Sequence, residues 1–296
     1  MARRIIDIHN HPNWHCKDIR ALVANMDEHG IEKTWLLSWE MPAGEIEAAP
    51  GYHEVMDPRG ICAPLWQVVE GLHMYPDRFI GGWAPDPRDR HVRRRLKAAV
   101  DIHGIRVYGE LKCRMRYDDP DAISTFRFCG ELGLPVIFHL ECPGFAIRRQ
   151  HESRDAWVEW YGGDISVVDA MCRQCPGTAF IGHAPGFWRE ISADAEASEQ
   201  GYPGGKVVPG GRLTDLMRKH ANLHGDLSAG SGCNALARDL EHARAFVLEF
   251  QDRLLFGRDY YDRRQLDVLE KLALGEAVLD KVLCRNAERL LSGTAR

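Results

Sequence analysis

Two histidines separated by a single residue, His9 and His11, follow a short apolar run near the start of the sequence. In a β-strand, side chains at positions i and i+2 point to the same face, so the two imidazoles can lie side by side. Neutral imidazole is the commonest protein ligand for metals, and a rigid pair supplies half of a tetrahedral zinc site. The pair suggests metal binding, provided that other segments contribute matching ligands.

Further candidate ligands stand at the ends of other apolar, strand-like runs: Glu110, His139, His183 and Asp259. Each has a simpler explanation on its own, because a lone core histidine is usually hydrogen-bonded and an aspartate after a strand usually caps a turn. One common location at the carboxyl ends of neighbouring strands accounts for all four histidines and both carboxylates together. We therefore predict a metal centre formed by these six side chains.

The elements that must position these residues alternate between strands and helices along the whole chain. Strands are expected at 5–11, 34–39, 79–84, 105–112, 135–141, 178–183, 222–227 and 253–257. Helices are expected at 18–29, 64–75, 89–103, 119–133, 164–175, 212–220 and 235–250, and again after the last strand. Eight such units favour parallel strands and an α/β fold of the (β/α)8 TIM barrel type, with a doubly wound open sheet as the alternative.

Three long insertions, 42–62, 142–163 and 187–211, each follow the carboxyl end of a predicted strand. In a barrel this end forms the rim on which the active site lies, so we expect the insertions to be lids or substrate-binding loops. They are not expected to form separate domains. The whole chain, 1–296, is therefore predicted to be a single domain.

Composition narrows the classes of partner. The 296 residues are 45% hydrophobic and 27% charged with a net charge of -5, which gives no support to binding of nucleic acid. No apolar run approaches the roughly 18 residues of a membrane-spanning helix. Nine cysteines are scattered without a disulfide framework, so we expect reduced thiols and a cytoplasmic location. A small-molecule substrate and a homodimer, the commonest oligomer, are the expected partners.

The order of the candidate ligands resembles the amidohydrolase superfamily of metal-dependent hydrolases. The resemblance rests on His-x-His on strand one, Glu or Lys on strand four, His on strands five and six, and Asp on strand eight. Four motifs look most like the amidohydrolase-2 branch, which includes aminocarboxymuconate-semialdehyde decarboxylase-type enzymes: Asp7-x-His9-x-His11, Gly182-His183, Phe256-Gly257-Arg258-Asp259 and Asn286-Ala287-x-x-Leu290-Leu291.

The resemblance leaves the number of metal ions open. Decarboxylase-type members bind one metal through the strand-one pair, the strand-five histidine and the terminal aspartate. Gly109-Glu110 instead resembles TatD-type hydrolases, in which a strand-four glutamate bridges two metals. Lys112, as a carbamylated bridging lysine, is the alternative, but its position two residues further out favours Glu110. The expected cofactor is one or two divalent ions, zinc in the first place and manganese as the alternative.

The expected reaction is hydrolysis of a small-molecule amide, lactone or ester by a metal-activated water. Asp259 would be a ligand and proton acceptor, and His183 would bind a second metal or polarise the substrate oxygen. Asp7 is expected to orient a ligand imidazole. Candidates for substrate binding are Arg106, Lys112, Asp226 and Arg258. Two alternatives stay open: a metal-dependent decarboxylase of an unsaturated carboxylic acid, and a non-catalytic barrel with a structural metal.

Overall fold

The computed structural model describes residues 3–40, 63–142, 162–197 and 200–293. The predicted insertion 42–62 and most of 142–163 lie outside these residues. The described residues contain eight short strands: β1 (Ile6–Asn10), β2 (Lys33–Leu37), β3 (Phe79–Gly82), β4 (Tyr108–Leu111), β5 (Val136–His139), β6 (Phe180–His183), β7 (Leu223–Asp226) and β8 (Leu254–Leu255).

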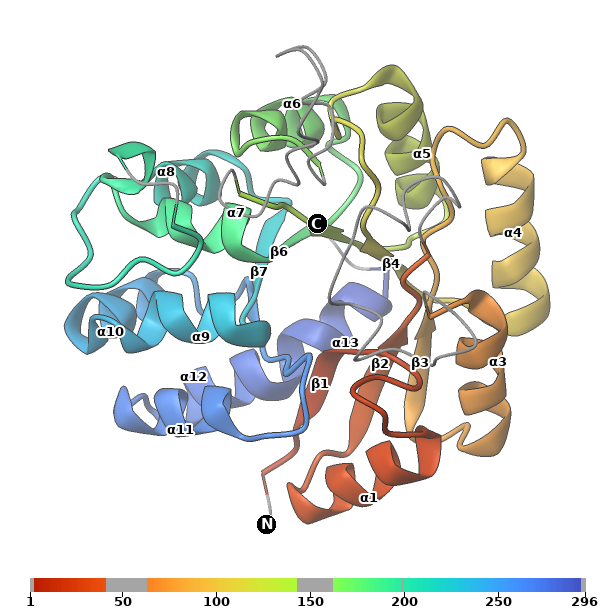
Figure 1. Cartoon of the computed structure of the whole chain (residues 1–296), viewed down its shortest axis with the longest axis horizontal. Helices are drawn as coiled ribbons and strands as arrows, with labels where there is room; N and C mark the ends of the chain where they lie inside the picture. The colour runs from red at the N-terminus through yellow and green to blue at the C-terminus, as the bar shows by residue number, and fades with distance from the viewer. Residues whose placement is uncertain (1–2, 41–62, 143–161, 198–199, 294–296) are drawn as a thin grey trace, which may run out of the picture.

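Helices surround these strands (Figure 1). Those that follow the first five strands are α1 (Ile19–Glu28), α3 (Leu65–Met74), α4 (Val92–His103), α5 (Pro120–Glu131) and α6 (Ser166–Gln174). Those that follow later strands are α7 (Pro185–Trp188), α8 (Arg212–Lys219), α9 (Ala229–Ala237), α10 (Leu240–Glu249), α11 (Arg264–Lys271), α12 (Glu276–Asp280), the π-helix η6 (Lys281–Arg285) and α13 (Asn286–Leu291). None of the described helices is both long and apolar enough to cross a membrane.

The strands form a closed ring. All paired strands are parallel and fall into two groups, β1-β2-β3 and β4-β5-β6-β7-β8. A parallel bridge between Gly82 and Val107 joins β3 to the segment that enters β4. On the other side, the Ile8 amide donates to the carbonyl of Phe256 at 3.0 Å, which joins β1 to the end of β8. The predicted (β/α)8 TIM barrel is confirmed.

The barrel interior is apolar at its amino-terminal end. Ile6, Ile8, Trp35, Ile137, Ile181 and Leu255 meet there, and Cys284, Ala287 and Leu290 from η6 and α13 pack against them. The last helix thus closes this end of the barrel. Apolar side chains therefore fill the amino-terminal half of the interior. The polar residues that end the strands lie at the opposite, carboxyl-terminal end.

One predicted helix was wrong in its bounds. Residues 235–250 form parts of two helices, α9 and α10, and α9 already begins at Ala229. The break lies at Asp239, whose carboxylate accepts a hydrogen bond from the His242 amide at 3.2 Å and so caps a new helix. Apolar periodicity runs through both helices, so it does not show the break between them.

The first residues of the insertion 187–211 are buried against the barrel. The insertion starts within α7 and continues through two 3-10 turns, η4 (Arg189–Ile191) and η5 (Ala195–Ala197). Trp188 is fully buried, and its indole N–H donates to the carbonyl of Asp226 at 2.7 Å. This contact ties the insertion to the end of β7, beneath the predicted metal centre.

Candidate metal centre

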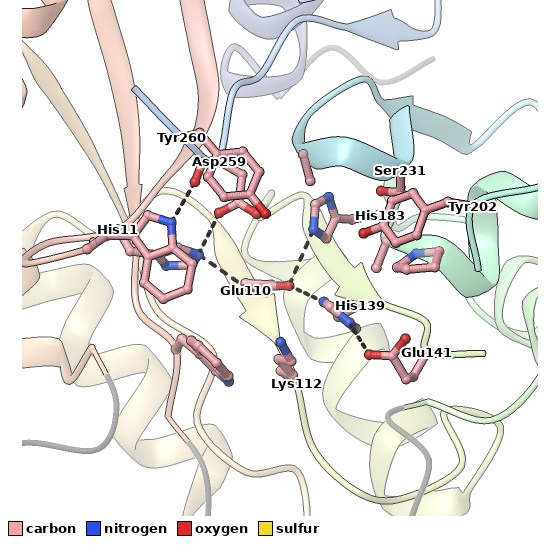
Figure 2. A pocket seen from close by; sticks show the side chains of 15 residues that line it. His11, Glu110, Lys112, His139, Glu141, His183, Tyr202, Ser231, Asp259 and Tyr260 are labelled. Carbon is pink, nitrogen blue, oxygen red and sulfur yellow. Dashed lines mark hydrogen bonds and ion pairs between the residues drawn. The ribbon is translucent and has the colours of Figure 1, made fainter. Parts of the chain in front are cut away.

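The six predicted ligands come together at the carboxyl-terminal end of the barrel. Figure 2 shows all of them except His9, which does not line the cavity drawn there. Each of them is at most 8% exposed. They come from five strands or the residues just beyond them: His9 and His11 from β1, Glu110 from β4, His139 from β5, His183 from β6, and Asp259 from the segment after β8. Because parallel strands end at one rim, residues distant in the sequence become neighbours.

Glu110 occupies the middle of the cluster, and its two oxygens face different histidines. Oε2 lies 3.4 Å from Nε2 of His11 and 3.8 Å from Nε2 of His9. Oε1 lies 2.6 Å from Nδ1 of His139 and 3.7 Å from Nε2 of His183. The carboxylate therefore divides the centre into a first half, around Oε2, and a second half, around Oε1.

Asp259 completes the first half. Its Oδ1 lies 3.6 Å from Nε2 of His11 and 3.9 Å from Nε2 of His9. The residue has φ 60°, a conformation uncommon outside glycine. Two main-chain contacts hold it there: its amide donates to the His9 carbonyl at 2.8 Å, and the Trp14 indole N–H donates to its carbonyl at 2.5 Å.

Candidate ligand atoms lie within 4.8 Å of one another in three overlapping groups: His9, His11 and Glu110; Glu110, His139 and His183; and His9, His183 and Asp259. Two observations show that these groups fit metal ions. Nε2 of His9 and Oδ1 of Asp259 are buried without a hydrogen-bond partner among the described residues, an arrangement that is costly unless another atom satisfies them. Imidazole nitrogen and carboxylate oxygen are also the donors that zinc and manganese take.

The outer nitrogens of three imidazoles are anchored. Nδ1 of His11 lies 3.0 Å from the carbonyl of Leu37, and Nδ1 of His9 lies 2.6 Å from Oδ2 of Asp226. The same carboxylate lies 3.0 Å from Nδ1 of His183. An acceptor at Nδ1 holds the proton there and leaves Nε2 free to bind a metal in the centre.

Asp226 therefore orients two imidazoles, one in each half of the centre, and does not line the cavity above it. Asp226 was predicted to bind substrate, and the structure places its carboxylate against these two imidazoles instead. Gly257 makes the arrangement possible, because a Cβ at that position would lie 2.7 Å from Oδ1 of Asp226 and 3.2 Å from Cβ of His9. The glycine of the Phe-Gly-Arg-Asp motif thus allows β8 to approach the centre.

Asp7 has a different role from the predicted one. Its carboxylate accepts from Nε of Arg258 at 2.8 Å, and from the amides of Arg258 at 2.9 Å and His9 at 3.1 Å. The Arg258 side chain is fully buried and also donates to Oδ1 of Asn25 at 2.7 Å. Arg258 therefore holds β8 against β1 beside the centre, and the structure does not bring it to the cavity, where it was predicted to bind substrate.

Arg106 is not brought to the site. Its side chain is exposed at the amino-terminal end of the barrel, where it donates to the carbonyl of Leu291 in α13. Strict alternation placed Arg106 and Lys112 on one face, but Arg106 precedes β4 (Tyr108–Leu111) and Lys112 follows it, so the two side chains lie at opposite ends of the barrel.

Lys112 does line the cavity, with its Nζ 3.9 Å from the centroid of the Trp39 ring. Its amine therefore lies over an aromatic face, whereas the Glu110 carboxylate lies among the four histidines. This geometry supports Glu110 as the strand-four ligand.

Sequence reasoning missed Glu141, which accepts at Oε2 from the outer nitrogen of His139, Nε2, at 3.1 Å. Its other oxygen, Oε1, accepts from the Cys142 amide at 3.1 Å. His139 thus presents Nδ1 to Glu110, the reverse of the other three histidines. The only sequence signal for Glu141 is its spacing of two residues from His139, which places both side chains on one face.

Neighbouring histidines favour the ionised form of two buried carboxylates, those of Glu110 and Asp226. Burial by itself raises the pKa of Glu110, but His139, His11 and His9 together hold that pKa well below its usual range. Burial opposes ionisation of Asp226 in the same way, and His9 and His183 nevertheless lower its pKa. Burial lowers the pKa of His9, but Asp226 and Glu110 raise it well above the ordinary value. Such a concentration of negative charge among imidazoles favours divalent cations.

A cavity of about 110 Å³ opens directly above the centre. Aromatic side chains wall it on several sides, namely Trp14, Trp39, Tyr202 and Tyr260. Lys112, Glu141 and Ser231 add polar groups, as Figure 2 shows. The centre can therefore be reached by a small molecule, which must fit between aromatic walls.

The fold and the site define a metal-binding TIM barrel. Its family follows from comparison of the sequence with known protein families. The family model of the Amidohydro_2 amidohydrolases matches residues 6–293, so the chain belongs to that family. Members of the family are enzymes, and they include both hydrolases and decarboxylases. No curated protein sequence matches the chain.

Solved structures share the fold at low sequence identity. An uncharacterised TIM-barrel protein from Bordetella bronchiseptica has a TM-score of 0.62 at 17% identity, covering 99% of this chain and 100% of its own. A probable 2-pyrone-4,6-dicarboxylic acid hydrolase from Acinetobacter baumannii has a TM-score of 0.58 at 13% identity, and the match covers 97% of this chain and 99% of that one. A dihydroxybenzoic acid decarboxylase from Polaromonas, with bound manganese, has a TM-score of 0.54 at 17% identity, and the match covers 98% of this chain and 97% of that one.

Proposed function

We propose that this protein is a hydrolase that uses two divalent metal ions to cleave a small-molecule amide, lactone or ester. The observation that carries the proposal is the position of Glu110, whose two oxygens face different histidines at 2.6 to 3.8 Å. A carboxylate shared in this way can bridge two ions, as two-metal hydrolytic sites require. We propose zinc because imidazole nitrogen dominates the donor set, with manganese as the alternative.

Bound metal would supply a Lewis acid and a water of pKa about 7. The chain's own residues have separate tasks around that water. His9, His11 and Asp259 would hold one ion, His139 and His183 the other, with Glu110 shared between them. Asp259 lines the cavity, so its carboxylate can also accept the proton of the attacking water and pass it to the leaving group.

Decarboxylation is the second candidate, because solved decarboxylases are among the structures similar to this chain. It predicts one metal ion per chain and release of carbon dioxide from an unsaturated carboxylic acid. A purely structural metal is disfavoured, since that role needs a closed site and this centre opens on a cavity. The single-domain organisation, the homodimer and the cytoplasmic location remain predictions.

Metal counting combined with one substitution tests the proposal. Elemental analysis of purified protein is expected to give two ions per chain, and Glu110→Gln at most one. Lys112→Gln, just beyond the end of the same strand, is the matched control and is expected to keep both ions. One ion in the wild-type protein would refute the two-metal proposal, and loss of an ion in Lys112→Gln but not in Glu110→Gln would assign the bridge to the lysine.

Product analysis then separates the two reactions. The protein is expected to release acid from one member of a panel of lactones, amides and esters, and no carbon dioxide from unsaturated acids. Chelation of the metal should abolish that activity. Carbon dioxide release without any hydrolysis would establish the decarboxylase instead.

A further inference from the structure

A second cavity, of about 740 Å³, lies at the amino-terminal end of the barrel. Its lining comes from the residues that enter three strands: 176–179 before β6, 221–222 before β7 and 252–253 before β8. The ends of α6 and α8, together with α13, complete its walls. Since the metal centre stands at the carboxyl ends of the same strands, the barrel interior separates the two sites.

The lining is strongly cationic in a chain whose net charge is -5. Four cationic residues line the cavity: Arg173, Lys219, Arg253 and Arg289. The single lining carboxylate, Asp252, pairs with Lys281 at 2.9 Å, and Asp169 lies 2.5 Å from Nζ of Lys219. Among the described residues, the three guanidinium groups have no carboxylate within 4.0 Å. The three guanidinium groups thus line the cavity without a directly paired carboxylate, although Glu249 and Asp252 partly offset the charge of Arg253 from a greater distance.

Two of the guanidinium groups are held by neutral acceptors. Nη1 of Arg253 donates to the carbonyls of Met217 at 2.5 Å and of His220 at 2.8 Å. Nη2 of Arg289 donates to the carbonyl of Asp252. Main-chain carbonyls fix the two side chains but leave their formal charges in place.

His224 also lines the cavity, and the charges of nearby arginines act on its imidazole. It is 5% exposed, and its Nδ1 lies 3.3 Å from the carbonyls of Phe180 and Asn222. Burial and the charges of Arg253 and Arg289 lower its pKa to about 4. The other ionisable groups that line the cavity are Cys172, Arg173, Lys219, His220 and Asp252.

We propose that this cavity binds a small organic anion that carries a phosphate group. Guanidinium groups bind phosphate through paired, charge-assisted hydrogen bonds, and a phosphate dianion neutralises more of the excess charge than a single carboxylate does. The volume exceeds what an inorganic ion fills, and Pro176, Ala179 and Leu290 offer apolar surface to an organic part. The site is independent of the metal centre and of the reaction proposed there.

Calorimetric titration of the metal-loaded protein with adenosine monophosphate tests the proposal, with adenosine as the uncharged match and succinate as a dicarboxylate. We expect adenosine monophosphate to bind more tightly than succinate, and adenosine not to bind. Arg173→Gln and Arg289→Gln should each weaken binding at least tenfold, the loss of a charge-assisted hydrogen bond. Arg94→Gln, an exposed arginine of α4, is the matched control and should bind as the wild type does.

A second measurement places the ligand. The pKa of His224, followed by NMR, should rise when adenosine monophosphate binds, because the phosphate offsets the arginine charges. Arg173 makes no hydrogen bond or ion pair within the described part of the chain, so its variant keeps the test valid if Arg289→Gln unfolds. Unchanged affinity in Arg173→Gln, binding without a shift of His224, or tighter binding of succinate would each overturn the proposal.

Discussion

Asp226→Asn tests whether one buried carboxylate supports both halves of the metal centre. Oδ2 of Asp226 lies 2.6 Å from Nδ1 of His9 and 3.0 Å from Nδ1 of His183. An asparagine of nearly the same size that turns its amide nitrogen toward either imidazole requires an acceptor at Nδ1. That moves the imidazole proton to Nε2, the nitrogen that faces the centre, and so blocks metal binding there.

The magnitude follows from the number of imidazoles affected. Loss of a partner that orients one ligand histidine lowers metal affinity about 10-fold to 100-fold. Asp226 orients one histidine in each half, so the product of the two dissociation constants should rise by about 10²-fold to 10⁴-fold. Glu141→Gln is the matched comparison, because Glu141 contacts a single imidazole, that of His139. It should weaken one ion by about 10-fold to 100-fold and leave the other unchanged.

Competition with a metal-sensitive chelator measures both constants, and circular dichroism checks that each variant keeps its fold. Two weakened ions in Asp226→Asn and one in Glu141→Gln are expected. If Asp226→Asn bound both ions with wild-type affinity, the assignment of Asp226 to both imidazoles would be refuted. If it weakened a single ion, the division of the centre by Glu110 would be wrong.

Three further predictions concern the surroundings of the centre. Arg258→Leu should lower the free energy of unfolding by about 3–5 kcal/mol in denaturant titration, because Asp7 is then buried without its partner; a loss under 1 kcal/mol would contradict this. The lowered pKa of His224 means that the unfolded chain binds more protons between pH 6.5 and about 4, so stability should fall by about 3 kcal/mol as the pH drops through that window. His224→Gln should remove that part of the pH dependence, and identical pH profiles would refute it. Arg106→Gln should change turnover less than twofold in steady-state kinetics, whereas a large loss would place that arginine in the reaction.

The convergence of the six candidate ligands could be predicted because local patterns mark them in the sequence. His9 and His11 show the spacing of one strand face, and His139 and His183 end apolar runs. In a parallel barrel these local marks suffice, because the fold brings all strand ends to one rim.

The partners that orient the ligands could not be predicted in the same way. Asp226 and Asp7 both lie on strands next to the centre, and only the packing of β8 against β1 decides that Asp7 contacts Arg258 while Asp226 contacts the imidazoles. The position of Arg106 could not be predicted for a related reason. Alternation along a strand predicts the face on which a side chain lies, but not its height along the barrel axis.

The contacts that join β1 to the last two strands have a consequence for biosynthesis. His9 meets Asp226 across 217 residues, and Asp7 meets Arg258 across 251. The residues of β1 thus wait for partners that are synthesised 217 to 251 positions later. Contacts of such long sequence separation slow folding, because a large loop must close before they form. A nascent chain therefore cannot assemble the complete metal centre until Asp259 has left the ribosome, so metal loading is expected to follow translation.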